Sequence, residues 1–110
     1  MSKVVFLKVS NVSNEDVQKN VKKAKALGEW KKYIHGPKIF LKINGISDQV
    51  GPGQCTSPWV LEAVLQEVRG AYPNAEISLG DANLAAAKQL DKASILWGHR
   101  ELAEKYGARF

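Results

Sequence analysis

Apolar residues along the chain form short runs that alternate with longer stretches of helical spacing. The runs at 3–9, 38–43 and 75–79 are short and rich in Val, Ile, Leu and Phe, which is typical of strands. Over 14–27 and 58–69, apolar residues recur at the spacing of one helix face, so each stretch predicts an amphipathic helix. The pattern therefore predicts strands that alternate with helices.

The last part of the chain adds further helices and the beginning of a strand. Residues 84–90 are strong helix formers, and 99–106 predict a short last helix that ends at Gly107. Residues 108–110 then resemble the start of a fourth strand. Because three residues make a very short strand, we expect this chain to be a truncated N-terminal segment of a longer protein.

Strands that alternate with helices define an α/β fold, expected here as one domain over 1–110. We expect a three-layer arrangement with a mostly parallel sheet of three to four strands and flanking helices. The most compact strand order is 2-1-3-4, flavodoxin-like, which places the 3–9 strand between those at 38–43 and 75–79. The 38–43 run is expected to be a central strand covered on both faces.

A glycine-rich loop joins the 38–43 strand to the next helix. Ser57 is expected to cap this helix, with Pro58 at its first position. A loop that leads into a helix N-terminus offers free backbone N–H groups and a partial positive charge, which favour anions. The alternative is a surface loop without a ligand, and both interpretations stay open. The loop's glycines and proline are Gly45, Gly51, Pro52 and Gly53.

Two charged residues lie at the expected carboxyl ends of strands. Lys42 near the end of an apolar strand either reaches solvent at the strand's rim or contacts an anion there. Asp81 follows Gly80 at the end of the 75–79 strand, where open α/β folds place ligand-binding carboxylates. Asp81 could equally cap the next helix.

The charge balance is moderately basic, with 16 Lys and Arg against 11 Asp and Glu and a net charge of +5. Six of the lysines lie between 19 and 32. We interpret them as the solvated face of the first helix, because no helix-turn-helix, zinc-finger or RNA-recognition pattern supports nucleic-acid binding. No apolar run reaches the roughly 18 residues of a membrane-spanning helix.

The single cysteine, Cys55, excludes a disulfide within the chain, and a reducing cytoplasm is the expected location. Cys55 lies just before a helix N-terminus, where it is either a reactive thiol or an incidental loop residue. His35 and His99 are far apart and have no third ligand beside them, so a zinc site is not expected. The standard nucleotide-binding and hydrolase fingerprints are absent.

Four short motifs occur in an order and spacing that resemble a known family. They are LKIN at 41–44, TSPWVLEAVLQEV at 56–68, AEISLGDA at 75–82 and HRELAEKYGARF at 99–110. The chain is similar to the N-terminal part of the uncharacterised family named domain of unknown function 362. Members typically have a strand that ends in Lys-Pro-Asn, and Ile43 takes the place of that proline here.

The resemblance implies functional roles for residues at the matching motif positions. It implies an anion or small-ligand site formed by Lys42, Asn44, Thr56, Ser57 and Gly80, and a metal-binding role for Asp81. Some members carry a ferredoxin-like cluster domain, which a chain with one cysteine cannot supply. The resemblance also implies a redox- or metal-linked context, without an established reaction or cofactor.

Two hypotheses for function follow. In the first, the chain contributes part of a site for a small anion or a divalent metal at the carboxyl ends of its strands. In the second, it is a non-enzymatic binding or assembly module that uses the basic first helix or an exposed sheet edge. Because unpaired edges associate readily, a homodimer through a sheet edge is expected in the second case.

Overall fold

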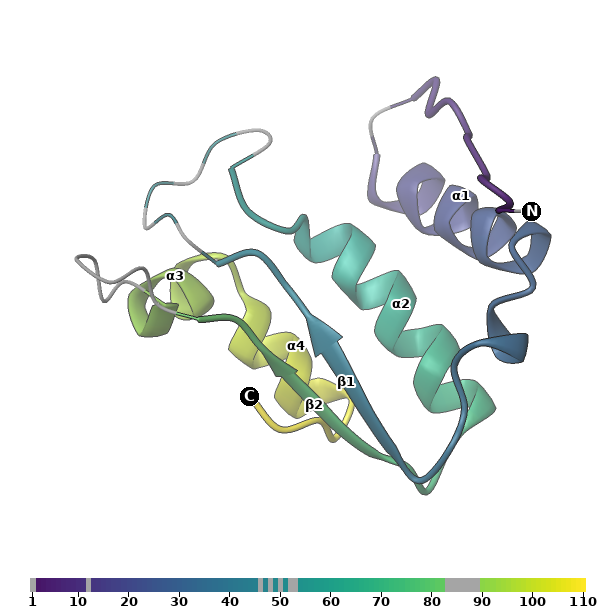
Figure 1. Ribbon diagram of the computed structural model, residues 1–110. Coiled ribbons are helices and arrows are strands. Elements are labelled where there is room, and N and C mark those ends of the chain that lie inside the picture. The colour runs from purple at the N-terminus through teal and green to yellow at the C-terminus, as the bar shows by residue number, and fades with distance from the viewer. Residues whose placement is uncertain are drawn as a thin grey trace.

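A computed structural model describes residues 2–11, 13–45, 47, 49, 51, 54–82 and 90–110. The described chain is a mixed α/β structure with a parallel sheet, as the sequence predicts (Figure 1). In chain order its elements are α1 (Asn14–Leu27), the 3-10 helix η1 (Trp30–Lys32), β1 (Lys38–Lys42), α2 (Pro58–Ala71), β2 (Glu76–Gly80), α3 (Leu90–Leu96) and α4 (His99–Lys105).

The sheet consists of β1 and β2, which run parallel with Lys38 opposite Glu76 and Lys42 opposite Gly80. Arg109 extends it by a single parallel bridge to Ser78. The Arg109 amide donates to the Ile77 carbonyl at 2.8 Å, and its carbonyl accepts from the Leu79 amide at 2.7 Å. The predicted start of a strand at 108–110 therefore corresponds to one bridged residue beside β2.

The predicted position of the first strand is wrong. Because β1 and β2 pair directly, no place remains between them for residues 3–9. These residues belong to no strand, and the side chains of Val4 and Phe6 are 87% and 89% exposed. The flavodoxin-like order fails because direct pairing already satisfies the facing edges of β1 and β2.

The core lies between the sheet and the helices α2 and α4. Leu61, Leu65 and Val68 of α2 are buried in one cluster with side chains from both strands and with Ala103 of α4. The cluster includes Ile39, Ile77 and Leu79 of the strands and Ile43 directly after β1. Helix α1 packs against α2 on the side away from α4, so the three helices lie side by side (Figure 1).

The expectation that the 38–43 strand is central and covered on both faces is also wrong. Phe40 is 62% exposed, and Lys38 and Lys42 beside it on the same face are exposed as well. Successive side chains of a strand point to opposite faces, so Ile39 faces the helices while these three face outward. The described part of the sheet thus has one covered face instead of the two in a three-layer fold.

The helix boundaries follow local signals in the sequence. The Ser13 hydroxyl accepts a hydrogen bond from the Asp16 amide at 3.2 Å at the start of α1, and Gly28 ends that helix. Gly107 follows α4 with φ = 62°, a left-handed conformation that glycine adopts at low cost. The predicted helix over 84–90 and the loop residues Pro52 and Gly53 lie outside the described residues, except for Leu90, which begins α3.

Within the described ranges, none of the helices is both long and apolar enough to cross a membrane.

Candidate functional site

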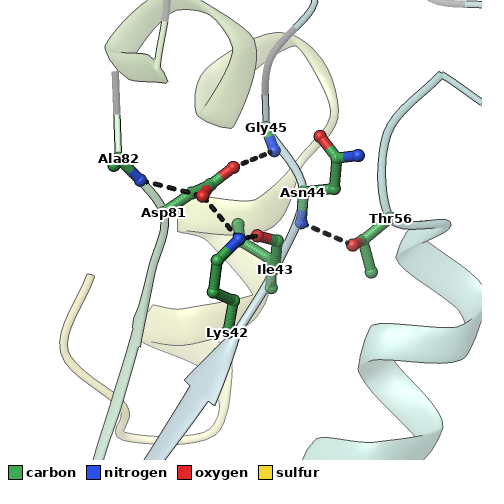
Figure 2. A network of polar contacts seen from close by, with 7 residues as sticks. All are labelled: Lys42, Ile43, Asn44, Gly45, Thr56, Asp81 and Ala82. Atoms are coloured by element: carbon green, nitrogen blue, oxygen red, sulfur yellow. Dashed lines mark hydrogen bonds and ion pairs between the residues drawn. The ribbon is translucent and has the colours of Figure 1, made fainter. Parts of the chain in front are cut away.

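A close ion pair joins the ends of the two strands. The Lys42 ammonium donates to Asp81 Oδ1 at 2.6 Å and to the Ile43 carbonyl at 3.1 Å (Figure 2). The Asp81 side chain is only 7% exposed, whereas that of Lys42 is 67% exposed. Lys42 therefore covers the carboxylate and leaves its own stem in solvent.

Backbone amides complete the surroundings of the Asp81 carboxylate. The Gly45 amide donates to Oδ2 at 3.0 Å, and the Ala82 amide donates to Oδ1 at 2.8 Å. The hydrogen bond from Lys42, followed by that from Gly45, lowers the pKa of Asp81 from its ordinary value of 3.8 to about 2. Asp81 is thus a charged carboxylate that fastens the chain beyond β1 to the chain beyond β2.

A second pair of hydrogen bonds fastens the end of β1 to the loop before α2. The Asn44 amide donates to the Thr56 hydroxyl at 2.8 Å, and the Thr56 amide donates to the Asn44 carbonyl at 3.0 Å. The side-chain amide of Asn44 projects from the strand end on the side of Thr56, away from the Lys42–Asp81 pair (Figure 2). Asn44 and Thr56 therefore set the place where the chain enters α2.

His99, which the sequence identifies only as the start of the last helix, supports this loop from behind. It is fully buried and its Nε2 lies 2.8 Å from the Thr56 carbonyl. Because a carbonyl oxygen only accepts hydrogen bonds, Nε2 is the donor in this contact. Nδ1 is buried with no hydrogen-bond partner among the described residues. The only sequence signal for this role was the position of His99 directly after Gly98, at the start of a helix.

The first turn of α2 offers backbone donors at the same edge. Ser57 occupies the N-cap position, but its side chain makes no capping hydrogen bond, so the predicted capping role of its hydroxyl is wrong. The first intrahelical bond runs from the Leu61 amide to the Ser57 carbonyl at 3.0 Å. The amides of Trp59 and Val60 precede it, while Pro58 has none.

Gly80, the last residue of β2, contributes through its backbone. Its carbonyl accepts from the Ile43 amide at 3.0 Å. The hydrogen-bond ladder between β1 and β2 therefore extends as far as the Lys42–Asp81 ion pair. A Cβ atom at this position would lie 3.5 Å from the Phe40 ring, an ordinary contact. Gly80 therefore has a structural part at the edge, and its φ does not require glycine.

The structure thus brings the candidate residues from the sequence to one edge of the molecule, where the two strands end and α2 begins (Figures 1 and 2). They do not form a set of metal ligands, because Asp81 is surrounded by an ammonium group and two amides. In the described parts of the chain, no three His, Cys, Asp or Glu side chains gather closely enough to hold a metal ion.

The remaining candidates, Cys55 and His35, do not join this arrangement. The Cys55 thiol is half-buried and lies 3.5 Å from the Ser47 carbonyl, which also accepts from Trp97 Nε1 at 3.1 Å. His35 is exposed in the connection that leads to β1. The Ser47 carbonyl thus accepts hydrogen bonds from both Cys55 and Trp97.

No protein-family model, curated protein or solved structure matches this chain.

Proposed function

We propose that this chain binds a small anion, such as a phosphate or a carboxylate, at the edge where β1 and β2 end and α2 begins. The amides of Trp59 and Val60 and the Ser57 hydroxyl would donate to the anion, and Lys42, at the end of β1, would add positive charge to this edge of the molecule. The proposal develops the expectation from the family-like motifs, and the likeness to domain of unknown function 362 remains a prediction.

One observation carries the proposal: hydrogen bonds fasten the three segments of this edge to each other. Lys42 and Gly45 hold Asp81, and Asn44 and Thr56 hold one another, all between 2.6 and 3.0 Å. A pre-positioned edge binds a ligand with less loss of conformational freedom. The donors lie at the N-terminus of α2, where the positive end of the helix dipole also attracts an anion.

The arrangement favours an anion over a metal ion as the ligand. A divalent metal at Asp81 would have to displace the Lys42 ammonium from Oδ1, and the charge of that ammonium would repel it. An anion needs no such displacement, because Lys42 is exposed and can lean toward a second acceptor. Asp81 then acts as the group that holds Lys42 in place.

The test is a titration of the full chain with inorganic phosphate, followed by the shifts of backbone amide resonances. We expect saturable shifts at Ser57, Trp59 and Val60, and about tenfold weaker binding in both Ser57→Ala and Lys42→Met. Lys38→Met is the matched control, because Lys38 is an exposed lysine at the opposite end of the same strand. Equal losses in Lys38→Met and Lys42→Met would reduce the effect to net charge and contradict the proposal.

The variant Asp81→Asn distinguishes an anion-binding site from a metal-binding site. If the ligand is an anion, the variant still binds phosphate, because none of the proposed donors to the anion belongs to Asp81. If Asp81 is a metal ligand, the same variant loses affinity for magnesium or manganese ions, and the anion proposal fails.

A further inference from the structure

The outer edge of β1 is an unpaired edge of the sheet. The Ile43 amide donates to Gly80 and the Pro37 carbonyl accepts from Glu76, so alternate residues from Pro37 to Ile43 face β2. In a parallel ladder the residues between them direct their N–H and C=O groups to the other side. Those of Lys38, Phe40 and Lys42 therefore face an edge that pairs with no other strand in the described chain.

Helix α1 lies beyond this edge of the sheet, and none of the described strands packs beneath it (Figure 1). It lies beside α2 on the side away from α4 (Figure 1), and it contains no buried residue. Its apolar stripe of Val17, Val21 and Ala24 is only half-buried, and Leu27 is exposed. A strand beside β1 would lie beneath α1, as the strand before a helix does in a right-handed crossover.

Residues 3–9 have the composition of the missing strand but lie elsewhere. They run along the outer side of α1, away from the sheet (Figure 1). The Lys3 Nζ atom lies 3.9 Å from Glu29 Oε2, and the Val5 side chain lies near the end of the same helix, 3.8 Å from where a Cβ atom at Gly28 would be. No backbone hydrogen bond joins residues 3–9 to another described residue, and Val4 and Phe6 point into solvent.

We infer that residues 3–9 of one copy of this chain pair with the outer edge of β1 in a second copy, so that two chains exchange N-terminal strands. The occupant is a second copy because α1 stands between the segment and its own β1 (Figure 1), while the Val4 and Phe6 side chains of the segment face outward. A reciprocal exchange closes with two-fold symmetry, as in domain-swapped dimers. This inference does not rest on the proposed anion site.

The charges at the edge set a condition for the exchange. One end of the segment, with either Lys3 or Lys8, would approach Lys38 of β1, whereas Lys42 at the other end of β1 is already paired with Asp81. Lysines on edges oppose association between strands. Because salt screens this repulsion, the dimer should be stronger at high than at low ionic strength.

The test measures the mass of the full chain in solution over a wide concentration range, with amide hydrogen exchange in parallel. We expect a monomer–dimer equilibrium and protection of the Phe40 and Lys42 amides in the dimer. Phe6→Asp should weaken the dimer by about tenfold or more, because it places a charge in the paired strand. Tyr33→Asp is the matched control, because Tyr33 is an exposed aromatic residue outside the segment.

A proline at Phe40 tests the edge itself. Phe40→Pro removes an N–H group that faces away from β2, so it should block the exchange and leave the ladder between β1 and β2 intact. Phe40→Ala keeps that N–H group and should dimerise, and circular dichroism verifies the fold of both variants. A monomer at every concentration would overturn the inference, whether Phe40 and Lys42 are protected by the chain's own segment or not at all. A dimer that Phe6→Asp and Phe40→Pro leave intact would overturn it as well.

Discussion

At the scale of single residues, the candidate site depends on a carboxylate that the fold keeps charged. Asp81 accepts from Lys42, Gly45 and Ala82, and these donors stabilise the ionised form over the protonated one. The sequence placed Asp81 at a strand end but left open whether it binds a ligand or caps a helix. Its partners Lys42 and Gly45 are far away in the sequence, and no spacing rule identifies them.

Asp81 should make the stability of the fold sensitive to acid. Its pKa is about 2 in the folded chain against an ordinary 3.8, so its contribution is present above pH 4 and is lost as the pH falls toward 2. Asp81→Asn should lower the free energy of unfolding by about 1–3 kcal/mol at pH 7. In urea unfolding, the gap between the variant and the natural chain should narrow as the pH falls through this range.

Asp91→Asn serves as the control, because Asp91 pairs with Arg100 in an exposed position and such pairs contribute little. A gap for Asp81→Asn that stays constant from pH 7 to pH 2 would contradict the stated role of the carboxylate.

Lys25 illustrates how a sequence pattern can misplace a charged side chain. It belongs to the lysine-rich stretch interpreted as a solvated face, yet its Nζ is buried and lies 4.1 Å from the centre of the Trp30 ring. Burial lowers the pKa of Lys25 to about 8. The indole face replaces part of the lost hydration, a partner that only the turn after α1 brings within reach.

At the scale of elements, one side chain connects the end of α2 to two later segments. Arg69 donates to the carbonyls of Pro73 and Ala75 before β2, and to those of Tyr106 and Gly107 after α4. A planar guanidinium can satisfy several carbonyls at once. Arg69 thereby positions the chain that carries Arg109 to the sheet.

Arg69→Met should lower the free energy of unfolding by about 2–4 kcal/mol, because it leaves partly buried carbonyls without donors. Arg109→Met is the control, because the exposed Arg109 side chain makes a long ion pair of 3.7 Å with Glu76. This substitution should change the free energy of unfolding by no more than about 0.5 kcal/mol. Urea unfolding measures both variants. Equal losses would mean that the four hydrogen bonds of Arg69 contribute nothing specific.

Helices α1, α2 and α4 and the two strands could be predicted because their signals are local. Ser13 before α1, Pro58 at the start of α2 and Gly107 after α4 each act within a few residues. The run at 3–9 has the same kind of pattern as that at 38–43, yet only the second pairs in the sheet. Periodicity describes what a segment can form, whereas pairing depends on which distant edge it meets.

At the scale of the whole molecule, the carboxyl ends of the strands were predictable as a shared edge, and the faces of the sheet were not. Parallel strands bring Lys42 and Asp81 together whichever strand lies beside them. Coverage of Phe40 depends on a layer of helices that the described chain does not place there. The sequence therefore located the candidate site better than it located the layers around it.

The same imbalance predicts that the molecule opens unevenly. Helix α1 has no buried residue, whereas α2 buries Leu61, Ala63, Leu65 and Val68. Segments with few buried apolar contacts open locally at lower free energy than the core. In the monomer at low concentration, the amides of α1 should exchange by local opening, and those at the centre of α2 only when the whole chain unfolds.

Hydrogen exchange followed by mass spectrometry or NMR measures this difference directly, with destabilisation by low urea as the diagnostic. Amides at the centre of α2 should respond to urea with the full dependence of global unfolding, while those of α1 should respond weakly. If both helices showed the same exchange free energy and the same urea dependence, α1 would be part of one cooperative core. The half-buried stripe of Val17, Val21 and Ala24 would then need no further strand to complete it.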